Sequence, residues 1–294
     1  MLYLDTSAVR AVGKRLAQLH RPDLCTSALT IVELVAAATS SEAELKRIRP
    51  GLEVLLTGSP VSIDWRMPEA FQATSFAWMK ENCQMQERRL ESLTKLGSLV
   101  VSSSSLTEFG ERETAAKLQF PVDYWREFDF LFGKAYVESS RVTGLQLREA
   151  FERAKRGEGN IGLLGTAIQD MTYPAFCRWF AKEHSLVNRS ATVHALAHRL
   201  AADMTSADPP DNLVAAIHDS YDGSIDVFVD AFSWRAMVDH GEGRTPGRND
   251  ALDLAHFLAI ETNAVLSTGD RIMSETALAS GLKVISPNQL ESAA

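Results

Sequence analysis

Short apolar runs alternate with helical periodicity at both ends of the chain. The apolar runs predict strands at residues 2–4, 24–27, 61–63, 264–267 and 283–285. The 3.6-residue spacing of apolar positions between them predicts helices at 7–20, 30–39, 42–56, 251–262 and 272–280. Strands that alternate with helices predict a parallel sheet covered by helices. The pattern therefore indicates an α/β fold.

The middle of the chain has a different pattern. From residue 77 to 240 helical periodicity continues without convincing strands, for example over 107–119, 123–156, 174–204 and 224–239. No fixed repeat is present, which argues against a solenoid. The simplest organisation is one α/β core built from residues 1–76 plus 241–294, interrupted by a mostly α-helical insertion over 77–240.

Composition narrows the function classes. The 294 residues are 45% hydrophobic and carry a net charge of −8, which argues against broad non-specific nucleic-acid binding. An enzyme that holds metal ions in an acidic pocket is still compatible, because the ions reverse the local field. The three cysteines lie far apart and indicate a reducing compartment. No apolar segment approaches the roughly 18 residues that span a membrane, and no secretion signal is evident, so we expect a cytoplasmic protein.

Four acids occupy positions where strands end or helices begin. Asp5 follows the first strand, Glu33 lies early in a helix, Asp250 opens a helix and Asp270 follows a late strand. Each has an ordinary structural explanation, such as a helix cap, a turn, or for Glu33 a capping box with Thr30. Carboxylates gathered at one edge of a sheet repel one another unless cations neutralise them. Oxygen ligands of this kind suit Mg²⁺ or Mn²⁺.

The segments around these acids resemble a known family. LYLDTSAV, TSALTIVELVAAA, NDALDLAHFLA and AVLSTGD look like the four motif regions of PIN-domain nucleases, the group that includes VapC-type toxins. The resemblance implies an α/β/α sandwich around a parallel sheet and an acidic pocket that binds Mg²⁺ or Mn²⁺ and cuts RNA. It covers the two ends of the chain and not the insertion.

The resemblance also assigns candidate residues. The metal-binding and catalytic acids are Asp5, Glu33, Asp250 and Asp270. The assisting candidates are Thr6, Ser7, Asp253 and Thr268, although Asp253 fits a solvated helix face equally well. Arg244 and Arg248 lie just before Asp250 on a glycine-rich loop and are candidates for binding substrate phosphate.

The resulting hypothesis is a metal-dependent endoribonuclease, toxin-like or RNA-processing, in which a metal-activated water attacks the phosphodiester bond. RNA is the expected substrate, although DNA is also compatible. For the insertion, binding of an antitoxin or other protein, formation of a homodimer, and restriction of access to the pocket fit equally well.

Two other functions compete with this hypothesis. A haloacid-dehalogenase-type phosphatase also begins with a strand that ends on Asp, but it needs a second Asp two residues later, where this chain has Ser7. A catalytically silent PIN-like module that binds only RNA or protein is the other alternative. The presence of all four acids argues against it.

Overall fold

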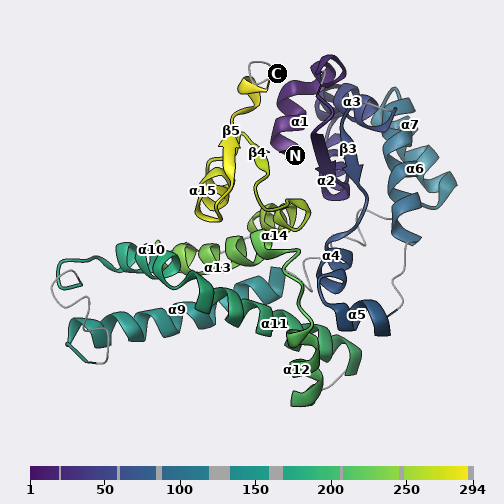
Figure 1. Cartoon of the computed structure of the whole chain (residues 1–294). Coiled ribbons are helices and arrows are strands. Elements are labelled where there is room, and N and C mark those ends of the chain that lie inside the picture. Colours follow the sequence, from purple (N-terminus) through teal and green to yellow (C-terminus); the bar gives the residue numbers. More distant parts are fainter. Residues whose placement is uncertain are drawn as a thin grey trace.

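The computed structural model describes most of the chain. The described residues are 1–19, 21–57, 60–83, 88–118, 133–158, 168–205, 208–244 and 248–290, with the side chains of 88–91, 135, 248 and 249 excepted. Five parallel strands form one sheet in the order β3-β2-β1-β4-β5 (Figure 1). Their bounds are β1 Leu2–Leu4, β2 Leu24–Ser27, β3 Ser62–Asp64, β4 Val265–Ser267 and β5 Lys283–Ile285. The predicted α/β class with a parallel sheet is confirmed.

Strand β1 lies at the centre of the sheet. Its three residues are buried, as expected for a strand covered on both faces. It pairs with β2 on one side and with β4 on the other, and Leu4 is level with Ser267. The chain moves outward from β1 through β2 to β3, and from β4 to β5 in the opposite direction. The carboxyl ends of β1 and β4 therefore form a topological switch point, where open α/β sheets bind their ligands.

The helices of the predicted core follow the expected pattern, with the bounds of α3 as predicted and those of the other predicted helices shifted. They are α1 Thr6–Val12, η1 Gly13–Gln18, α2 Ala28–Ala38, α3 Glu42–Leu56, α4 Pro68–Thr74, α14 Arg248–His256, η4 Phe257–Ala259, α15 Arg271–Ala279 and η5 Pro287–Gln289. The predicted capping box is wrong. Helix α2 begins at Ala28, with Ser27 at the N-cap position, and Thr30 is buried inside the helix, where its hydroxyl bonds that of Thr26 at 2.8 Å. Glu33 is therefore not engaged as a cap.

In the described part of the middle of the chain the regular elements are helices, and an isolated β-bridge joins Phe76 to Tyr221. The helices are α5 Ala77–Asn82, α6 Arg88–Ser102, α7 Leu106–Ala116, α9 Lys134–Lys155, α10 Tyr173–Glu183, α11 Ser185–Thr205, α12 Asp211–Asp219 and α13 Asp226–Gly241. The single helix predicted over 174–204 is wrong, because the backbone leaves helical geometry at His184 and divides it into α10 and α11. The first part of the helix predicted over 123–156 lies outside the described residues. Within the described part, no helix is both long and apolar enough to span a bilayer.

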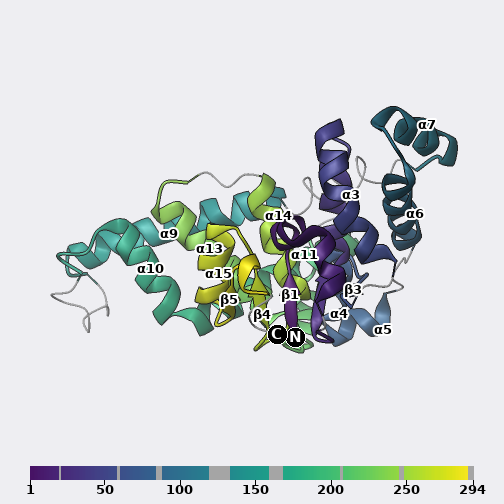
Figure 2. The same ribbon diagram turned by 90° about the horizontal axis from the view of Figure 1, so that it is seen from above.

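The insertion shares its packing with the sheet. One continuous hydrophobic cluster joins β1 to side chains from the insertion, among them Leu96, Val193 and Phe228. A second, smaller cluster lies where α9 and α10 meet α13. Helix α13 runs between these insertion helices and α14 and α15 (Figures 1 and 2). It therefore carries the contact of the insertion with α14 and α15, whereas α6 packs against α2 and α3.

Candidate functional site

Asp5 lies at the switch point, immediately after β1, and is only 3% exposed. Its carboxylate caps α1 by accepting a hydrogen bond of 2.7 Å from the backbone of Ala8. The hydroxyl of Ser7 donates to its two oxygens at 2.9 and 3.0 Å, and that of Thr268 donates at 2.6 Å. All of these donors are uncharged. Burial raises the pKa of Asp5 despite the hydrogen bonds.

Thr268 links the two ends of the chain at this point. Its hydroxyl oxygen donates to Asp5 and accepts from the backbone nitrogen of Asp270 at 3.0 Å. A second link is made by Ser7, whose hydroxyl accepts from the backbone of Gly269 at 2.8 Å. Asp270 itself is the N-cap of α15. The structure therefore brings Asp5, Ser7, Thr268 and Asp270 into one hydrogen-bonded group.

Glu33 enters the same region from α2 and is paired with a histidine. Its carboxylate lies 2.9 Å from Nε2 of His256 and also accepts from the hydroxyl of Thr6. Burial raises the pKa of Glu33, but the charge and hydrogen bond of His256 outweigh it, so the net shift is downward. Correspondingly, burial lowers the pKa of His256 and the carboxylate outweighs that effect. Nδ1 of His256 is fixed by the hydroxyl of Tyr3 at 2.8 Å.

Asp253 belongs to this group of acids. Its pKa is raised to about 7, mainly by burial and also by the negative charges of Glu33 and Asp270, against the opposing charges of His256 and Arg235. The carboxylates are thus near enough to act on one another. Asp253 is half-buried and within electrostatic reach of Glu33 and Asp270, so a fully solvated helix face does not describe its environment.

Asp250 lies one helical turn before Asp253 on α14, but its carboxylate is paired with an arginine. Its Oδ1 accepts a hydrogen bond of 2.5 Å from Nη2 of Arg235, on α13. The candidate phosphate ligand Arg244 contacts Glu242 and lies 3.7 Å from Asp239. The side chain of Arg248, the other candidate, lies outside the described residues.

Four residues of this region were not found from the sequence: Tyr3, Arg235, Asp239 and His256. The spacing of Asp250, Asp253 and His256, three residues apart on α14, was a usable signal, because side chains three apart share a helix face. Tyr3 carried no such signal, since it is one apolar-looking position in a buried strand. The i,i+4 spacing of Arg235 and Asp239 on α13 was also visible, but the contact of Arg235 with Asp250 was hidden because Asp250 lies on another helix.

The donor chemistry fits a hard divalent cation. The region offers carboxylate and hydroxyl oxygens, which Mg²⁺ and Mn²⁺ prefer. His256 acts on Asp5, Glu33 and Asp253, while Glu33 and Asp270 repel the charge of Asp253, so a cation would relieve this repulsion. In the part of the chain that the structure describes, no group of three or more His, Cys, Asp or Glu side chains is already arranged to hold an ion.

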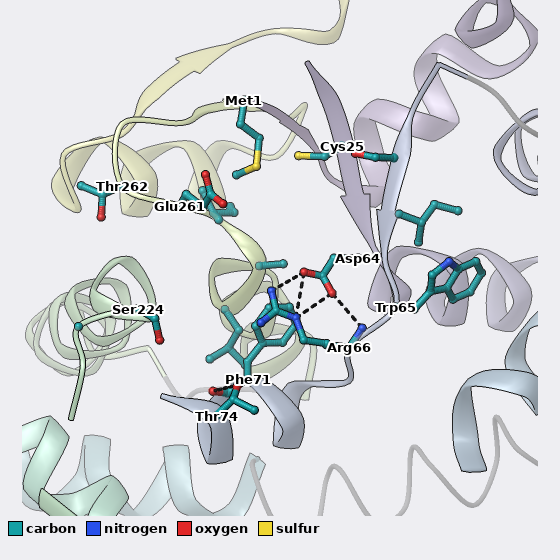
Figure 3. A pocket seen from close by; sticks show the side chains of 16 residues that line it. Met1, Cys25, Asp64, Trp65, Arg66, Phe71, Thr74, Ser224, Glu261 and Thr262 are labelled. Atoms are coloured by element: carbon teal, nitrogen blue, oxygen red, sulfur yellow. Dashed lines mark hydrogen bonds and ion pairs between the residues drawn. The ribbon is translucent and has the colours of Figure 1, made fainter. Parts of the chain in front are cut away.

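A separate pocket of about 740 Å³ opens beside β3 (Figure 3). Asp64 ends this strand, much as Asp5 follows β1, but its carboxylate is held by the guanidinium of Arg66 at 2.6 Å. Arg66 also lies 4.1 Å from the ring centre of Phe71. None of the candidate acids lines this pocket. An acid at a strand end is thus not distinctive by itself, and the difference lies in whether a cationic side chain neutralises it.

Comparison of the chain with protein-family models, with curated proteins and with solved structures finds no match. The resemblance to PIN-domain nucleases therefore stays a prediction. Any functional conclusion rests on the residues at the switch point and their contacts.

Proposed function

We propose that this protein is a metal-dependent endoribonuclease of the PIN-domain type. The observation that carries the proposal is the buried carboxylate of Asp5, joined through Thr268 to Asp270 at the switch point of a parallel sheet. Glu33 and Asp253 lie within electrostatic reach of the same group. Perturbed acids gathered where the fold binds ligands are typical of functional sites.

The residues divide into ligands and supports. Asp5, Glu33, Asp250 and Asp270 would hold Mg²⁺ or Mn²⁺, with Asp253 as an additional acid. When bound, such an ion supplies a nucleophilic water at neutral pH and offsets the charge of the phosphate. Ser7 and Thr268 fix the orientation of Asp5 by donating to it.

His256 has a supporting role in this arrangement. It keeps Glu33 ionised through their contact, and the hydroxyl of Tyr3 holds its ring in place. Ligand orientation by outer hydrogen bonds of this kind commonly changes metal affinity by about 10–100-fold. Arg244 and Arg248 remain the candidates for holding the RNA backbone, because guanidinium groups bind phosphate oxygens.

The test compares two acids at the ends of parallel strands. Asp5→Asn should reduce metal-dependent cleavage of a structured RNA by at least about 100-fold, while the helix cap is retained because Asn caps as well as Asp. The matched control is Asp64→Asn, which alters an acid already paired with Arg66. The assay uses Mg²⁺, Mn²⁺ or EDTA and expects products with 5′-phosphate and 3′-hydroxyl ends.

Several outcomes would contradict the proposal. Equal RNA cleavage by Asp5→Asn and the unchanged protein would remove Asp5 from the reaction. Faster cleavage of single-stranded DNA than of RNA would change the substrate. Phosphate release from a small monoester, without RNA cleavage, would favour the phosphatase.

A further inference from the structure

Helix α13 carries a buried ion pair that is directed toward the candidate site. Arg235 is 2% exposed and Asp239 is 1% exposed. Nε of Arg235 donates to Oδ2 of Asp239 at 3.2 Å, and the hydroxyl of Tyr136 on α9 donates to the same oxygen at 2.8 Å. Nη2 of Arg235 reaches Oδ1 of Asp250 at 2.5 Å. One continuous chain of contacts thus runs from α9 through α13 to α14.

Asp239 and Asp250 share the positive charge of Arg235. Asp239 offsets the positive charge of Arg235 inside the insertion, which lowers the cost of burying the guanidinium. Asp250 then gains a fixed hydrogen-bond partner, while the Arg235–Asp239 pair as a whole is neutral. A buried ion pair of this kind seldom adds net stability. The orientation of Arg235 toward Asp250 therefore calls for a functional explanation.

A second arginine shows what a purely structural pair looks like here. Arg189 on α11 contacts Asp226 at 2.7 Å and Asp230 at 2.5 Å, and both acids lie on α13. Its side chain is 33% exposed. Arg189 thus joins two helices of the insertion, whereas Arg235 joins the insertion to an acid of the core.

We propose that Arg235 is a positioning residue for Asp250, and that the helical insertion orients this acid through Tyr136, Asp239 and Arg235. The inference rests on the proposed function, because the direction of Asp250 matters only if it is a metal ligand. It gives the insertion a role in the chemistry of the core. Outer partners that orient a ligating carboxylate are a recurrent part of metal sites.

The experiment measures Mn²⁺ affinity directly, by the electron paramagnetic resonance signal of free Mn²⁺, together with kcat and KM for RNA. The main variant is the double substitution Arg235→Gln with Asp239→Asn, which removes both charges and so leaves no buried ion unpaired. We expect a Kd for Mn²⁺ about 10–100-fold higher, a lower kcat and little change in KM. Arg235→Lys keeps the charge and should restore part of the affinity.

The controls separate positioning from loss of structure. Arg189→Gln should leave the Mn²⁺ affinity unchanged, and circular dichroism reports whether each variant is folded. If the double variant does not fold, Tyr136→Phe decides, since it removes only one hydroxyl from the chain of contacts. We expect it to raise the Kd for Mn²⁺ several-fold, and no change in Kd or kcat would overturn the inference.

The outcomes also separate this inference from the proposed function. If the unchanged protein binds Mn²⁺, Asp250→Asn weakens binding and the folded double variant does not, the positioning role of Arg235 is wrong and the nuclease proposal stands. If the unchanged protein neither binds Mn²⁺ nor cleaves RNA, the proposed function is wrong and this inference is wrong with it.

Discussion

Two groups of carboxylates in this molecule are stabilised in opposite ways. On the insertion, Asp226 and Asp230 both form an ion pair with Arg189. At the end of the sheet, Asp5, Asp253 and Asp270 form no ion pair with a lysine or arginine in the described part of the chain. Asp5 is held by hydroxyls and a backbone amide, and Asp270 accepts from a backbone amide.

This difference identifies the acids at the end of the sheet as residues that lower the stability of the fold. Burial without a cationic partner raises the pKa values of Asp5 and Asp253, so their ionised forms oppose folding at neutral pH. An arginine partner would offset this cost, as Arg189 does for Asp226 and Asp230 on the insertion. Sites that break such local rules are usually functional. Asp250 stands between the two groups, as an acid of the core held by an arginine of the insertion.

The sharpest way to separate the two groups is the pH dependence of stability in EDTA. The pKa of Asp253 is raised to about 7, above an unfolded value of about 3.9. Its stabilising contribution is present at low pH and is lost as the pH rises through 7. Asp253→Asn should therefore gain about 3 kcal/mol relative to the unchanged protein between pH 5 and pH 8, measured by urea unfolding. Asp230→Asn should show no such gain, and an equal difference at both pH values would contradict the prediction.

Metal binding should stabilise only the group at the sheet. Mn²⁺ at 100 times its Kd raises the free energy of unfolding by about 2.7 kcal/mol if it binds only the folded state. We expect calorimetry to show this rise in the unchanged protein and in Asp230→Asn. Asp270→Asn should lose most of it, and an equal rise in that variant would exclude Asp270 as a ligand.

Replacing the buried histidine tests the basic group that acts on Glu33, Asp5 and Asp253. His256→Gln loses the ion pair with Glu33 and should cost about 2 kcal/mol near pH 6. Because the pKa of His256 is raised, the contribution of its charge is present below about 6.5 and is lost as the pH rises through the raised value. The cost should thus shrink in alkaline solution. His218→Gln, at a more exposed histidine beside Asp219, should change stability by less than about 0.5 kcal/mol.

The smallest effect concerns a single hydroxyl. Thr268→Val removes the 2.6 Å hydrogen bond to buried Asp5 and should cost about 1 kcal/mol in urea unfolding. Thr57→Val is the control, because that hydroxyl is exposed and bonds only the carbonyl of Glu53. Equal costs in the two variants would mean that Thr268 is not a support for Asp5.

The sequence was most informative where one physical rule acted alone. Continuous apolar runs predicted β1 and β4, so the positions of Asp5 and Asp270 after strands followed directly, whereas the pairing of the two strands came from the structure. The capping box of Thr30 failed because tertiary packing buries that residue inside α2. A local motif does not show whether its side chain makes a different contact instead, as Thr30 does with Thr26.

The contacts that distinguish the acids come from distant segments and left no local pattern. The hydroxyl of Tyr3 reaches His256 across 253 positions, and Arg235 meets Asp250 from a separate helix. Periodicity places such residues on a helix face but does not identify the residue that they contact on another element. The structure supplied those partners, and with them the contrast between paired and unpaired acids.

The pairing of β1 with β4 has a consequence for synthesis of the protein. The hydrogen bond between Asp5 and Thr268 spans 263 positions, and a ribosome adds roughly 5–20 residues per second. The central strand must therefore wait roughly 10–50 s for its neighbour. For most of that interval the nascent chain lacks Thr268 and the acids of α14 and α15, so the hydrogen-bonded group around Asp5 forms only near the end of synthesis.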